Sequence, residues 1–142
     1  MNQLENILSQ SLSLFIVVPL IAFFITILLK NKSEKIIGQI VRAAKIFYII
    51  ISVVFFGGWL VNGLTPISYK LATIYQTEHF VFAIQFYYDE VTAVFSIVGS
   101  LLFFLVATFS KYYMHRDEGF KRFFNIILLF AAGYNFIIFS GN

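Results

Sequence analysis

The chain has 142 residues, of which 60 % are apolar and only 12 % charged, whereas soluble domains carry roughly 25 % charged residues. A soluble fold of this length would need a more polar surface, so the composition indicates a membrane protein. The chain has no cysteine, which excludes disulfides and thiolate metal sites. Its pI of about 9.2 comes from basic residues in two short connectors, not from a surface that would bind nucleic acid.

Four apolar runs are long enough to cross a hydrocarbon layer of ~30 Å as helices, because each helical residue rises about 1.5 Å. We predict membrane spans over residues 12–29, 46–64, 91–110 and 123–140. The first run is interpreted as a retained span, because no basic residue precedes it and no signal-peptide cleavage site follows it. Pro19 predicts a kink or local unwinding within that span.

The two connectors around the second span differ in character. Residues 30–45 are basic, but their apolar residues keep helical spacing, so this connector either lies at the membrane interface or extends the second helix. After the second span, aromatic and β-branched residues alternate on both sides of the polar tetrad 76–79, which predicts a β-hairpin over residues 67–88. A hairpin cannot cross lipid alone, so we expect it at the membrane surface with its aromatic face against the helices.

Charge is distributed unevenly between the connectors. Those after the first and third spans hold nine of the ten Lys and Arg residues. The positive-inside rule therefore places Lys32 and Arg116 in the cytoplasm, with His79, the hairpin and both termini outside. The predicted fold is an all-α membrane protein of four transmembrane helices, with a short extracytoplasmic β-hairpin between the second and third. We expect residues 1–142 to form a single membrane domain.

Candidate chemistry is sparse. His79 and His115 are expected on opposite sides of the membrane, so they cannot share a metal ion. The Asp89-Glu90 pair is interpreted as the start of a helix, and Asp117 as a partner of nearby basic residues. The predicted spans contain no ionisable Asp, Glu, Lys or His, so this chain alone has no visible proton path. In the fourth span, Asn125 and Asn135 are expected to make hydrogen bonds between helices.

A scattered motif surrounds the third span and the connector that follows it. It consists of an Asp, a Ser after an aromatic residue, a Tyr-Met pair, a second Asp, an Arg-Phe-Phe run and a later Asn: Asp89, Ser110, Tyr113, Met114, Asp117, Arg122, Phe123, Phe124 and Asn142. Their order and spacing resemble the N-terminal region of the chain-5-type membrane subunit of respiratory complex I, which is related to the large subunit of Mrp-type cation/proton antiporters. The resemblance covers residues 86–142, and residues 1–85 share only the family's layout. Where family members often have a histidine, this chain has Ala107.

The resemblance implies part of a proton-translocating, antiporter-like subunit in a bacterial inner membrane, with the lipid bilayer and other membrane subunits as partners. In the family, the buried Glu and Lys residues of the proton path lie in later helices. We therefore expect this chain to support conducting helices in a C-terminal continuation or in another piece of a split subunit. We expect no catalytic, cofactor or metal site in the chain itself.

Two alternatives stay open at this point. The local sequence YYMHRDEGFKRFFN is also similar to that of the antiporter-like subunit of bacterial inorganic-carbon uptake complexes. The chain could thus serve an inorganic-carbon uptake complex or an Mrp-type antiporter complex. A four-helix membrane scaffold without any transport activity is the other alternative.

Overall fold

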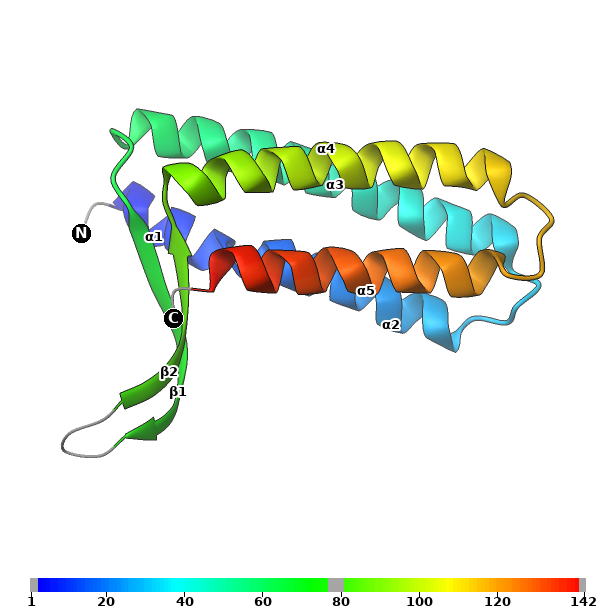
Figure 1. Ribbon diagram of the computed structural model, residues 1–142, viewed down its shortest axis with the longest axis horizontal. Coiled ribbons are helices and arrows are strands. Elements are labelled where there is room, and N and C mark those ends of the chain that lie inside the picture. The colour runs from blue at the N-terminus through cyan, green and yellow to red at the C-terminus, as the bar shows by residue number, and fades with distance from the viewer. Residues whose placement is uncertain (1–2, 77–80, 141–142) are drawn as a thin grey trace.

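Four long helices lie side by side, and a β-hairpin leaves the bundle at one end (Figure 1). The computed structural model describes residues 3–76 and 81–140. In chain order, the elements are α1 (Gln3–Ser11), α2 (Leu14–Leu28), α3 (Glu34–Val61), β1 (Ile67–Gln76), β2 (Val81–Tyr88), α4 (Glu90–Tyr113) and α5 (Phe120–Phe139). We call the end with the α2–α3 and α4–α5 loops the basic end, and the opposite end the hairpin end (Figure 1).

The first span is longer than predicted. The apolar helical stretch runs over Asn6–Leu28, with a turn at residues 12–13 that separates α1 from α2. It begins early because Leu8 is buried and extends the apolar face of the helix N-terminally from the buried Leu12, the first residue of the predicted span. The local unwinding predicted at Pro19 is absent, since α2 is continuous across that residue.

The basic connector extends the second predicted span, because helix α3 begins at Glu34 instead of residue 46. Helix α3 ends where the backbone changes conformation. Gly63 (φ 77°) and Leu64 (φ 60°) adopt left-handed conformations, which a right-handed helix cannot continue through. The Trp59 indole N–H donates to the Thr65 carbonyl at 2.9 Å, which ties the last turn of α3 to the chain that enters the hairpin.

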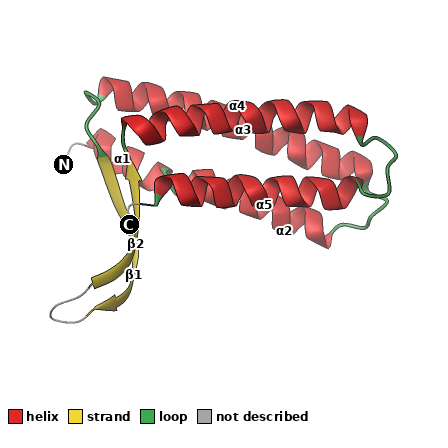
Figure 2. Cartoon of the chain, viewed as in Figure 1, coloured by secondary structure: helices red, strands yellow, loops and turns green. Residues whose placement is uncertain are grey.

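The β-hairpin forms as predicted, with β1 and β2 antiparallel and Ile67 opposite Tyr88. Its base is buried against the helices through Ile67, Phe86 and Tyr88. Two irregularities in β1 interrupt the alternation, and the outer half of the hairpin projects away from the bundle (Figure 2). The expected packing of the aromatic face therefore holds only at the base, since the Phe82 side chain is 47 % exposed. The predicted turn residue His79 lies outside the described residues.

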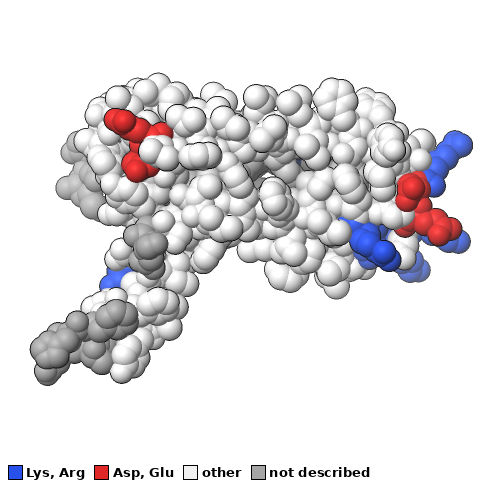
Figure 3. Space-filling model, viewed as in Figure 1, with Lys and Arg blue, Asp and Glu red and all other residues white. Residues whose placement is uncertain are grey.

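The helices pack as two pairs, α2 along α5 and α3 along α4. Phe15 stands at the centre, with edge-to-face contacts to Tyr48, Phe55 and Phe139 at centroid distances of 5.8, 5.7 and 5.3 Å. In the view of Figure 3, most Lys and Arg atoms lie at the basic end, and the visible flank of the bundle between its two ends is almost free of charge. Within the described residues, four helical stretches are long and apolar enough to cross a membrane.

Candidate functional site

Most motif residues lie in or beside the α4–α5 turn, but they do not converge on one point. Phe124 is fully buried and Met114 packs against the core, whereas Tyr113 is 89 % exposed. The remaining members are the partly exposed Ser110 and Phe123 and the exposed Asp117 and Arg122. The motif therefore builds a helix–turn–helix connection, not a catalytic pocket. Asn142 lies outside the described residues.

Asp117 has a local role that differs from the prediction. Its carboxylate accepts the backbone N–H of Gly119 at 2.6 Å and so closes the turn before α5. The predicted ion pair with a neighbouring basic residue is not formed, since the one ion pair among the described residues is His115–Glu34. Sequence proximity suggested a salt bridge, but the short Asp side chain reaches the backbone two residues ahead more easily.

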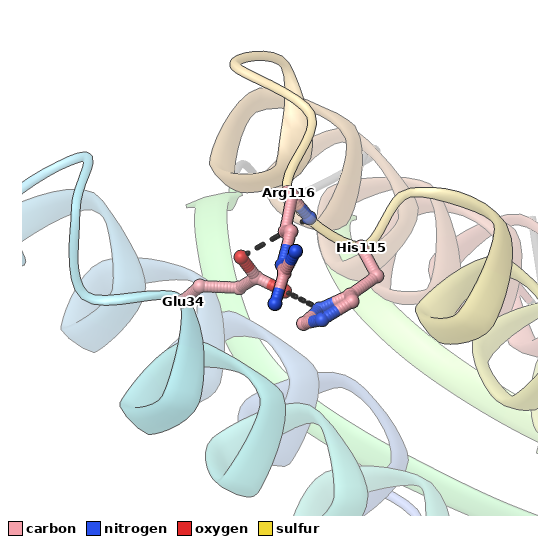
Figure 4. Close-up of polar contacts among 3 residues, drawn as sticks. All are labelled: Glu34, His115 and Arg116. Atoms are coloured by element: carbon pink, nitrogen blue, oxygen red, sulfur yellow. Dashed lines mark hydrogen bonds and ion pairs between the residues drawn. The ribbon is translucent and has the colours of Figure 1, made fainter.

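Glu34, the first residue of α3, joins the two loops of the basic end. One carboxylate oxygen lies 2.5 Å from His115 Nδ1, and the other accepts the backbone N–H of Arg116 at 3.3 Å. Figure 4 shows the Glu34 side chain reaching from α3 to both residues of the α4–α5 loop. Arg116 adopts φ 63°, so the loop bends where it meets Glu34. The contact fixes the α4–α5 loop against the start of α3.

Lys121 makes a second connection at this end. Its ammonium group donates to the backbone carbonyls of Ile27 and Leu29, at the end of α2. The last carbonyls of a helix have no partner within the helix, and a cation there also interacts favourably with the helix dipole. The first turn of α5 thereby caps α2, which explains how two helices that are distant in sequence stay paired.

Lys45 is a buried charge that the sequence prediction missed. The expectation of four spans without a buried ionisable group is wrong here, because Lys45 lies inside α3 and is only 9 % exposed. Its ammonium donates to the Thr108 hydroxyl at 2.6 Å and lies 4.9 Å from the centroid of the Phe104 ring. The hydropathy pattern placed Lys45 just outside the span, and its partner is 63 residues further along the chain.

Lys45 lies at the inner end of a basic cleft between α3 and α4. The outer part of the cleft is a cavity of about 500 Å³ lined by Glu34, Lys35, Gln39, Arg42, Lys111, His115 and Phe120. The inner part shares Arg42 and Lys111 with this cavity and is lined further by Gly38, Val41, Lys45, Ala107 and Phe124, but it is packed too closely to admit a water molecule. The Lys111 side chain crosses α3 at Gly38, where an added Cβ would lie 3.4 Å from Lys111 Cε. We refer to this region as the basic cleft.

The interior of the bundle contains two layers of polar contacts. As predicted, both asparagines of α5 make interhelical hydrogen bonds: the Thr26 hydroxyl donates to Asn125 Oδ1 and the Tyr48 hydroxyl donates to Asn135 Oδ1, each at 2.6 Å. Asn135 Nδ2 also donates to the Phe15 carbonyl at 3.1 Å. Within the described residues, every buried side-chain polar atom has a partner. These contacts are saturated and join helices, so they are structural.

Asp89 caps α4 at the hairpin end, as the sequence suggested. Its carboxylate accepts the backbone N–H of Thr92 at 2.8 Å. This hydrogen bond holds the pKa of Asp89 below its ordinary value. On the adjacent strand, burial raises the pKa of the Tyr88 hydroxyl. No group of three or more His, Cys, Asp or Glu side chains gathers anywhere in residues 3–76 and 81–140.

These features define a multi-pass membrane protein: four apolar helices, most Lys and Arg residues at one end, and buried polar groups that, within the described residues, all have partners. Residues 75–124 match the family model described as NADH-Ubiquinone oxidoreductase (complex I), chain 5 N-terminus. The matched segment contains the hairpin return strand, α4, the α4–α5 turn and the start of α5. The match confirms the resemblance noted from the motif residues. No curated protein matches the chain.

Proposed function

We propose that the chain is the N-terminal helical portion of a proton-translocating, antiporter-like membrane subunit of the NADH-quinone oxidoreductase type. The observation that carries the proposal is the family match over residues 75–124, which includes the whole α4–α5 turn and ends within the first turns of α5. A helical bundle long enough to cross the bilayer four times supports it further.

The proposed role is to support conducting helices, not to conduct. A proton path needs a series of titratable or hydrated groups through the membrane. Among the described residues of the four helical stretches, the one Asp, Glu, Lys, Arg or His side chain that is buried is Lys45, and it lies toward the basic end. The asparagine contacts in the interior are already paired. The conducting helices would then belong to a continuation of this subunit or to a separate chain.

The proposed setting is a bacterial inner membrane with the basic end in the cytoplasm. The clustering of Lys and Arg at the α2–α3 and α4–α5 loops supports this orientation through the positive-inside rule. Both termini and the hairpin would then be extracytoplasmic, with the hairpin base against the helix ends. In this proposal residues 1–142 are one membrane domain that binds no cofactor of its own.

Purification from native membranes tests the proposal. We expect an affinity-tagged chain, extracted in a mild detergent, to bring other membrane subunits of a translocating complex with it. Tyr113→Ala should weaken that association, because Tyr113 belongs to the family motif but is 89 % exposed and so free to contact a neighbour. Tyr112→Ala is the matched control, since Tyr112 is 79 % exposed and lies outside the motif. Recovery of the wild-type chain alone would favour the scaffold alternative.

A further inference from the structure

The basic cleft holds more positive charge than the chain neutralises. Arg42, Lys45 and Lys111 line its inner part, where no acidic residue is present. Glu34, the acidic residue of the outer part, is already engaged by His115 and the Arg116 backbone. Within residues 3–76 and 81–140, the partners of the Lys45 ammonium are a neutral hydroxyl and an aromatic ring, although Lys45 is nine-tenths buried. Buried charges are usually paired with an opposite charge, so the positive charge of the cleft calls for an anion that the cleft itself does not supply.

The depth of the cleft in the bundle indicates where the missing anion would come from. Helix α3 has 28 residues and is therefore about 42 Å long, whereas the hydrocarbon layer is ~30 Å thick. With Trp59 at the level of the opposite interface, the other edge of the hydrocarbon layer falls about 20 residues earlier, near Gln39. Arg42 and Lys45 then lie about 5 and 9 Å inside that edge, a depth from which long basic side chains extend toward the head groups. One and two turns beyond Arg42 on the same face, Ile46 and Ile50 are 43 % and 54 % exposed. Basic side chains next to the head-group layer, followed by an exposed apolar stripe, match the two parts of a lipid, its charged head group and its acyl chains.

We propose that the basic cleft binds the phosphodiester head group of an anionic membrane lipid. In this arrangement Arg42 and Lys111, which line the outer cavity, contact the phosphate oxygens, and the positive charge of Lys45 attracts the phosphate from the closely packed region beneath them. The acyl chains lie along the exposed apolar stripe of α3. A cavity of about 500 Å³ accommodates a glycerophosphate group, and basic pockets between helices are a known way of holding anionic lipids. Bound lipid would neutralise the charge that α3 and α4 now leave unpaired.

The experiment compares lipids and variants on the purified full chain in neutral detergent. Phosphatidylglycerol should raise the melting temperature by about 5 °C and bind at least tenfold more tightly than phosphatidylcholine. Lys45→Gln should reduce the difference between the two lipids to near zero. Lys32→Gln removes the same charge from an exposed position in the α2–α3 loop and should leave the difference intact. The double variant Arg42→Gln, Lys111→Gln should show the same reduced difference between the two lipids as Lys45→Gln. It replaces Lys45→Gln in the test if Lys45→Gln does not fold.

Three results would overturn the proposal. The first is equal stabilisation of the wild-type chain by both lipids. The second is an equal loss in Lys45→Gln and Lys32→Gln, because that would show attraction to the overall surface charge and not a site. The third is equal stabilisation by inorganic phosphate at the same concentration, which would assign the cleft to a free anion instead of a lipid.

Discussion

The Tyr48 hydroxyl on α3 donates to Asn135 Oδ1 on α5 at 2.6 Å, and both side chains are almost wholly buried. Asn135 Nδ2 then donates to the Phe15 carbonyl on α2. That carbonyl needs an outside donor, because its usual partner would be the backbone N–H of residue 19, and Pro19 has none. One asparagine thus completes the hydrogen bonding of a tyrosine and of a proline-interrupted helix.

We expect Asn135→Leu to be more destabilising than Asn125→Leu. Loss of Asn135 leaves two buried groups without partners, the Tyr48 hydroxyl and the Phe15 carbonyl, and should cost roughly 2 kcal/mol of unfolding free energy. Loss of Asn125 should cost only ~0.6 kcal/mol, because the Thr26 hydroxyl also reaches the carbonyls of Ala22 and Phe23. Unfolding in mixed micelles, followed by circular dichroism, measures both. Equal costs would contradict this account.

The role of Pro19 predicts a specific coupling with Asn135. In a Pro19→Ala background, residue 19 gains an N–H that can bond to the Phe15 carbonyl, so Asn135→Leu should cost about 1 kcal/mol less than in the wild-type chain. A double-mutant cycle on the unfolding free energy measures this difference. Strict additivity of the two changes would show that Asn135 does not compensate for the proline.

Gly99 is required for the close approach of α4 and α5. A Cβ at this position would lie 2.2 Å from Tyr134 Cε1, and the Tyr134 hydroxyl donates to the Phe95 carbonyl at 2.8 Å. Gly99→Ala should displace the Tyr134 ring and lose that hydrogen bond, at a cost of about 1 kcal/mol. Gly133→Ala is the matched control, because a Cβ there meets nothing within 4 Å. The melting temperatures of the two variants should differ, and identical values would count against the packing described.

The N-cap of α4 gives the stability a defined pH dependence. Because the pKa of Asp89 is lowered in the folded chain, its carboxylate stabilises the fold above the unfolded value of about 3.9. This contribution is lost as the pH falls through the lowered folded value. Asp89→Ala should therefore cost about 1 kcal/mol at neutral pH and progressively less below about pH 4.

Asp89→Asn separates capping from charge. An asparagine side-chain oxygen also caps a helix but does not titrate in this range, so this variant should stay near wild-type stability at neutral pH. It should lack the component of acid sensitivity that Asp89 contributes. Thermal melts of the three proteins across the acid range measure the effect. A cost of Asp89→Ala that stays constant with pH would refute the role of the carboxylate charge.

The proposed orientation is open to single-cysteine labelling, which needs no background substitutions because the chain has no native cysteine. Tyr75 in the hairpin is 59 % exposed, and Lys32 and Arg116 are exposed in the loops of the basic end. In intact cells, a membrane-impermeant maleimide should label Tyr75→Cys and leave Lys32→Cys and Arg116→Cys unmodified until the cells are broken. Labelling of Lys32→Cys and Arg116→Cys but not of Tyr75→Cys in intact cells would show that the orientation is opposite to the proposed one.

Hydropathy and residue alternation were sufficient to predict the four long helices and the hairpin, because burial in lipid and strand pairing both leave short-range patterns. They failed where the outcome depends on contacts between distant residues. The pattern left open whether residues 30–45 lie at the interface or extend the second helix; α3 in fact begins at Glu34, and that start is anchored by His115, 81 residues away. A charged residue ends an apolar run in sequence but need not end a helix in space.

The same limit applies to the candidate site. Asn125 and Asn135 were identifiable because polar amides in an apolar span need partners. That Asn135 would compensate for Pro19 could not be predicted, since 120 residues separate it from Phe15. Lys45 was missed for a related reason, because only the packing of α3 on α4 brings the Thr108 hydroxyl to its ammonium.

Proton flux in reconstituted vesicles tests the central claim most directly. The purified chain is placed in liposomes that contain a pH-sensitive dye, and a membrane potential is imposed. The same measurement is then made on the chain together with the membrane subunits that purify with it. We expect flux indistinguishable from empty vesicles for the chain alone and clear flux for the assembly. Flux through the chain alone that is abolished by Asn125→Leu combined with Asn135→Leu would contradict a supporting role.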